Sequence, residues 1–180
     1  MTATRAPGRS WPNGLSPWLW CGAAGLLSAP AIAMWLGAPG VHWTALDFVV
    51  MGLLLATACG LYEFGTRLNG GRAWRAGFGL AALTGLLTVW VNLAVGMLGS
   101  ETDPVNLMFA GVLAVAAIGA VAARFRPQGM SRAMAAAGLA QLAVVAGAAI
   151  GGRYQLHELL LTGCFALPWF ASAVLFSRAR

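Results

Sequence analysis

The sequence contains very little charge and no lysine. Aspartate, glutamate, lysine and arginine together make up 9% of its 180 residues, whereas 59% of the residues are hydrophobic. Because soluble domains carry about 25% charged residues, this composition excludes an ordinary water-soluble domain. All eleven basic residues are arginines and five residues are acidic, which gives a net charge of +6.

Motifs of known catalytic and cofactor sites are also missing. The chain has no GxSxG nucleophile motif, no lysine-containing phosphate loop and no GxGxxG dinucleotide fingerprint. Its three cysteines, Cys21, Cys59 and Cys164, occur singly in apolar stretches without CxxC spacing. We therefore expect them to be small packed side chains. The sequence predicts no cofactor and favours a non-enzymatic protein.

The hydrophobic residues form six runs of about 20 residues, the length needed to cross a bilayer core of roughly 30 Å. The runs cover residues 15–36, 46–65, 76–98, 105–123, 133–150 and 159–176. The predicted fold is all-α, a polytopic transmembrane helical bundle of six spans joined by short loops. A single transmembrane domain would occupy residues 15–177, between an N-terminal tail of residues 1–14 and a C-terminal tail of residues 178–180.

The first run has an alternative interpretation. Residues 31–33 read Ala-Ile-Ala and resemble a signal-peptidase site. If the first run is a cleaved signal peptide, five spans remain.

The arginines predict the orientation of the chain. With both termini in the cytoplasm, ten of the eleven arginines fall inside, with Arg153 outside, and four of the five acids fall outside. Positive loops are retained in the cytoplasm, so we expect a bacterial cytoplasmic (inner) membrane protein with cytoplasmic termini. This explains the positive charge without a nucleic-acid partner. The expected partners are the lipid bilayer and other membrane proteins or a second copy of the chain.

Polar residues inside predicted spans are functional candidates, because they are costly in lipid. Asn92 lies on a helical face whose other members are small or hydrogen-bonding: Gly85, Thr88, Gly96 and Gly99. It could join two helices by a hydrogen bond or line a solute path. Gln141 in the fifth run predicts a further hydrogen bond between helices.

Glu63 is expected near the cytoplasmic boundary, four residues before Arg67. This order favours an ion pair on a helix surface. A proton or cation relay is the alternative for Glu63.

The predicted outer face collects most other candidates. They are His42, Asp47, Glu101, Asp103, Asn106, His157 and Glu158. Acidic groups at this face could form the mouth of a cation path. The two histidines could instead contribute to a metal or haem site, although no HxxxH spacing supports one.

Six short motifs resemble those of an uncharacterised family of small bacterial multi-pass inner-membrane proteins. They read WTxxDF at 43–48, YE at 62–63, WVNLAVG at 90–96, GSE at 99–101, PxNLM at 104–108 and ARFRP at 123–127. The resemblance covers residues 43–142 and implies the multi-pass fold and the location, but no activity. Where such sequences usually read Glu-Asp-Asn-Pro, this chain has Glu-Thr-Asp-Pro at 101–104.

Three hypotheses follow. The leading one is a non-enzymatic accessory or structural membrane component, supported by small-residue faces such as Gly147-xxx-Gly151. The alternative is a small transporter or channel for a cation or proton-coupled solute, using Asn92, Glu63 and the outer acids. The third is a membrane metal or redox protein that uses His42 and His157.

Overall fold

The computed structural model describes residues 16–69 and 71–179. The predicted N-terminal tail, residues 1–14, lies outside this part. The helices are α1 (Ser16–Trp35), α2 (Ala45–Leu68), α3 (Arg72–Ala94), the short 3-10 helix η1 (Pro104–Leu107), α4 (Met108–Ala122), α5 (Pro127–Ile150), α6 (Leu156–Cys164) and α7 (Ala166–Ser177). Within the described residues there is no strand, and six helical segments are long and apolar enough to cross a membrane. The prediction of an all-α, six-span fold is confirmed.

The chain divides into two compact units, residues 1–48 and residues 49–180, with the boundary inside α2. The first unit contains α1 and the beginning of α2. The second contains the rest of α2 and the bundle formed by α3 to α7. Each unit is described separately below.

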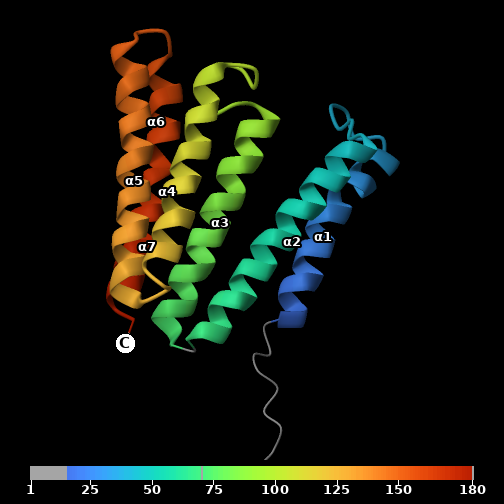
Figure 1. Ribbon diagram of the computed structural model, residues 1–180. Helices are drawn as coiled ribbons and strands as arrows, with labels where there is room; N and C mark the ends of the chain where they lie inside the picture. Colours follow the sequence, from blue (N-terminus) through green and yellow to red (C-terminus); the bar gives the residue numbers. More distant parts are fainter. Residues whose placement is uncertain (1–15, 70, 180) are drawn as a thin grey trace, which may run out of the picture. The chain divides into compact units, whose positions relative to one another are not determined.

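The bundle is built around α5 and α7. In Figure 1, α3, α4, α5 and α7 run side by side, and α5 packs against both α4 and α7 while α7 packs against α3. Large side chains fill the interior: Trp74, Phe109, Trp169 and Phe176 are each at most 2% exposed. Gly119 lets α4 approach α5 closely, because a β-carbon built there would lie 2.7 Å from the Cβ of Ala133.

The third span ends earlier than predicted. The prediction of a helix to residue 98 is wrong, because α3 ends at Ala94 and Gly96 has a φ of +76°. That conformation is strained for residues with a side chain but not for glycine. Met97 and Leu98 then turn into the core, where they are 6% and 0% exposed.

The last span is two helices, and Pro168 explains the interruption. Proline has no backbone N–H and its ring clashes with the carbonyl four residues earlier, which here belongs to Cys164. The helix is accordingly interrupted at Phe165, between α6 and α7.

The cysteines were only partly predicted. Cys59 is buried, whereas Cys21 and Cys164 are exposed. The expectation of packed side chains is therefore wrong for two of the three.

The two ends of the second unit differ in charge. One end, called here the arginine end, carries seven arginines at or near helix termini and in the loop after α4. They are Arg67, Arg72, Arg75, Arg124, Arg126, Arg132 and Arg178. The other end, called here the Asp103 end, contains residues 95–103 and 151–155, which are joined by a hydrogen bond between Tyr154 and Asp103.

Candidate functional site

Asn106 organises the loop of residues 95–103, called here the Asn106 loop. Its Oδ1 accepts hydrogen bonds from the backbone N–H groups of Met97 and Leu98, both at 3.1 Å. Its Nδ2 donates to the carbonyls of Leu98 at 3.0 Å and Ser100 at 2.7 Å. The side chain is 9% exposed. Asn106 therefore fills every hydrogen-bonding position with loop backbone and does not belong to an exposed outer cluster.

Asp103 starts the next span. Its Oδ1 accepts from the backbone N–H of Val105 at 3.1 Å, and Pro104 occupies the first turn of η1. Such a side-chain cap satisfies an N–H that the helix leaves unpaired. The Oδ2 accepts from the Tyr154 hydroxyl at 3.0 Å, which ties the Asn106 loop to the loop before α6.

These contacts shift two pKa values. The backbone hydrogen bond from Val105 lowers the pKa of the Asp103 carboxyl; desolvation opposes this, and Tyr154 and Arg153 add to the lowering. Desolvation raises the pKa of the Tyr154 phenol, and the hydrogen bond to Asp103 and its charge raise it further, against a smaller lowering by Arg153. Ionised Asp103 and neutral Tyr154 are thus the forms that the folded loop favours.

The pH dependence of stability follows from the Asp103 shift. A carboxyl with a lowered folded pKa stabilises the fold above its unfolded pKa of about 4, and this contribution disappears as the pH falls through the folded value. We expect Asp103→Asn to lose less stability than the wild type between pH 7 and pH 3, measured by denaturant unfolding in detergent micelles. Glu101→Gln is the matched control, because Glu101 is exposed on the same loop. If Asp103→Asn loses as much stability as the wild type between pH 7 and pH 3, the stabilising role of the Asp103 carboxylate is contradicted.

A buried polar network connects the Asn106 loop to α6 and α5. The Thr162 hydroxyl donates to the Met97 carbonyl at 2.6 Å, and the Gln141 Nε2 donates to the Thr162 carbonyl at 3.0 Å. Both side chains are buried. The predicted interhelical hydrogen bond of Gln141 is present. Thr162 was not predicted, because a threonine in an apolar run gives no sign of a contact 65 residues away.

Asn92 bonds within its own helix. Its Nδ2 donates to the Thr88 carbonyl at 2.9 Å, and the Thr88 hydroxyl in turn donates to the Thr84 carbonyl at 2.8 Å. The Asn92 Oδ1 is buried and has no hydrogen-bond partner among the described residues. The predicted face through residues 96 and 99 is wrong, because Gly96 and Gly99 lie beyond the end of α3.

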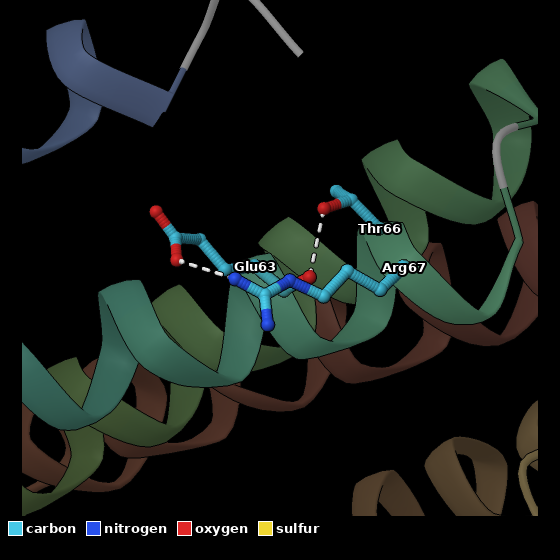
Figure 2. Close-up of polar contacts among 3 residues, drawn as sticks. All are labelled: Glu63, Thr66 and Arg67. Atoms are coloured by element: carbon cyan, nitrogen blue, oxygen red, sulfur yellow. Dashed lines mark hydrogen bonds and ion pairs between the residues drawn. The ribbon is translucent and has the colours of Figure 1, made fainter. Parts of the chain in front are cut away.

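Glu63 forms the ion pair that its spacing predicts. Figure 2 shows the Arg67 Nη2 facing the Glu63 Oε2, at 3.7 Å, while the Thr66 hydroxyl donates to the Glu63 carbonyl at 2.9 Å. The Arg67 side chain is 76% exposed, so the pair contributes at most about 0.5 kcal/mol to stability.

Asp47 caps α2. Its Oδ2 accepts from the N–H and the hydroxyl of Thr44 at 2.7 and 2.8 Å, and the Asp47 N–H donates back to the Thr44 hydroxyl at 3.3 Å. This reciprocal arrangement is a capping box. Asp47 therefore stabilises a helix start in the first unit, where His42 is exposed on the preceding connector.

His157 and Glu158 lie in the first turn of α6, His157 exposed and Glu158 partly buried. Within the described part of the chain, no three His, Cys, Asp or Glu side chains gather closely enough to hold a metal ion. The structure brings the Asn106 side chain onto the loop that contains Asp103, whereas Asn92 and Glu63 make their hydrogen bond and ion pair within their own helices.

Two grooves mark the surface of the second unit. The first, called here the α2–α3–α4 groove, has a volume of about 370 Å³ and reaches to Met130, Met134 and Trp169. The second, called here the α3–α6 groove, has a volume of about 580 Å³ and has His157 and Glu158 on its wall. Neither Asn92 nor Glu63 lines either groove.

Comparison with known proteins adds no family: no protein-family model, no curated protein and no solved structure matches this chain.

Proposed function

We propose that the chain is a non-enzymatic accessory component of a bacterial inner-membrane complex, with both termini in the cytoplasm. In this proposal the α2–α3–α4 groove binds a transmembrane helix of a partner protein. The arginine distribution supports the orientation, and the six membrane-spanning helices support the location. The observation that carries the proposal is the composition of the groove.

The α2–α3–α4 groove is apolar and has small residues on two of its walls. It contains no charged residue, and the hydroxyl of Thr57 is already bonded to the Leu53 carbonyl at 2.7 Å. The small residues recur at helical spacing on α3 and α4: Ala81, Ala82, Gly85, Ala116, Ala117 and Ala120. Small residues allow the backbone of another helix to approach closely, which is the main source of helix association in lipid. A lipid tail does not need this close approach, so the small residues favour a helix as the occupant.

Trp169 forms a buried part of the groove lining. It lines the groove, is 2% exposed, and its Nε1–H has no acceptor among the described residues. A buried unpaired donor costs about 1–3 kcal/mol. The Nε1 atom itself is inaccessible, so Trp169 contributes its apolar ring to the groove.

The transport hypothesis has less support. Its residues were Asn92, Glu63 and the outer acids. Asn92 makes a hydrogen bond to its own helix backbone, Glu63 forms a surface ion pair, and two of the outer acids, Asp47 and Asp103, cap helices.

Filling the groove tests the proposal. Ala117→Trp places a large side chain inside the groove, so we expect the chain to lose its stoichiometric partner when purified in mild detergent. Ile118→Trp is the control at the same depth, because Ile118 is 68% exposed and is not part of the groove lining. It should keep the partner. A wild-type chain that remains a lone monomer and moves a cation into liposomes would contradict the proposal. Co-purification of a second copy of the chain, without a different polypeptide, would identify the partner as the chain itself.

A further inference from the structure

The α3–α6 groove differs in chemistry from the α2–α3–α4 groove. Its α3 wall includes one threonine, Thr84, and is otherwise formed mainly by branched apolar side chains: Leu80, Leu83, Leu87 and Val91. Its opposite wall follows α6 and the start of α7, from His157 to Pro168. Leu83 and Leu161 are 50% and 66% exposed. These large side chains keep the backbone of another helix at a distance, whereas an acyl chain can pack between them.

The polar groups within this groove are already used. The Thr84 hydroxyl donates to the Leu80 carbonyl at 2.7 Å, and the Thr162 hydroxyl donates to the Met97 carbonyl. The deeper part of the groove therefore presents hydrocarbon to its occupant.

The mouth of the groove carries charge. His157 and Glu158 line it at the Asp103 end, where α3 has ended and α6 begins. The side chain of Gln155, the residue before α6, makes no cap, so it leaves the first-turn N–H groups to other acceptors such as an anion. Arg153 and Asp103 lie near Glu158, because the charges of all three residues act on Tyr154. The mouth thus combines an acceptor for a cation with donors for an anion, at the end of two membrane-spanning segments.

We propose that the α3–α6 groove binds a phospholipid whose headgroup carries a primary amine. One acyl chain occupies the groove, the ammonium group donates to the Glu158 carboxylate, and the phosphate lies at His157 and the start of α6. An ammonium has three N–H donors, whereas a trimethylated choline group has none and cannot form this charge-assisted hydrogen bond. The site is separate from the α2–α3–α4 groove and does not depend on a protein partner.

Native mass spectrometry of the purified full chain tests this proposal. The probes are phosphatidylethanolamine and phosphatidylcholine with identical acyl chains, exchanged into the same detergent. We expect the ethanolamine lipid to bind about fivefold more tightly, the size expected of one partly exposed charge-assisted contact. Glu158→Gln should reduce this ratio to about one. Glu101→Gln should leave it unchanged.

A second pair of variants tests the groove itself. Leu161→Trp fills the groove and should weaken both lipids, whereas Leu160→Trp, also exposed but outside the lining, should weaken neither. Helix content by circular dichroism confirms that each variant is folded. Equal binding of the two lipids by the wild type, or a ratio that persists in Glu158→Gln, would overturn the proposal. Tighter binding of phosphatidylglycerol than of phosphatidylethanolamine would overturn it as well.

Discussion

Asn106→Ala is expected to lower the free energy of unfolding by about 4 kcal/mol. The substitution removes four hydrogen bonds to the Asn106 loop and leaves the buried N–H groups of Met97 and Leu98 without an acceptor. Because the Thr162 hydroxyl bonds to the same loop at Met97, the attachment of α6 should loosen too. Denaturant unfolding in mixed micelles, followed by circular dichroism, measures the loss.

Two variants control this experiment. Asn92→Ala removes one bond to the chain's own helix backbone and a carbonyl oxygen that has no partner in the described structure. It should cost less than about 1 kcal/mol. Asn106→Asp keeps the acceptor for Met97 and Leu98 but places a carboxylate oxygen against the carbonyls of Leu98 and Ser100. Its loss should therefore be at least as large as that of Asn106→Ala. Equal losses for Asn92→Ala and Asn106→Ala would contradict the role assigned to Asn106.

Gly119→Ile is expected to separate α4 from α5 and to destabilise the bundle by about 3 kcal/mol. A β-carbon at Gly119 would lie 2.7 Å from the Cβ and 3.3 Å from the Cα of Ala133. The second of these atoms belongs to the backbone, so a side-chain rotation cannot relieve the contact. The expected readout is a lower melting temperature in detergent.

Gly111→Ile is the matched control, on the same helix and with the same added atoms. Nothing lies within 4 Å of a β-carbon built at Gly111. Replacing glycine there should be neutral or slightly stabilising, because isoleucine is the better helix former. A Gly119→Ile variant as stable as Gly111→Ile would show that α4 and α5 are not packed through these residues.

The spans were predictable from sequence because their length and apolar composition are local properties. The Glu63–Arg67 pair was predictable for the same reason, since residues four apart on a helix are neighbours. The capping box of Thr44 and Asp47 is also local, and its spacing was present in the sequence. Because an acid at a helix start can also face solvent, the spacing alone does not distinguish a cap from a member of an outer acidic cluster.

The end of α3 and the role of Asn106 could not be predicted locally. Whether Gly96 continues a helix or leaves it depends on Asn106, ten residues later, which bonds the turned backbone of Met97 and Leu98. The same holds for Thr162, whose partner is Met97. In a membrane, an unpaired backbone group is costly. The side chains of Asn106 and Thr162 therefore supply the hydrogen bonds that the loop backbone cannot make with itself.

Site-specific photocrosslinking in the intact membrane tests the central claim, that the α2–α3–α4 groove binds a partner helix. One variant carries a benzophenone amino acid at Ala117, inside the groove. A second variant carries it at Ile118, at the same depth but outside the groove. We expect position 117 to crosslink to one defined polypeptide in high yield and position 118 to crosslink only to lipid. Lipid adducts alone at both positions, or equal capture of proteins from both, would contradict it.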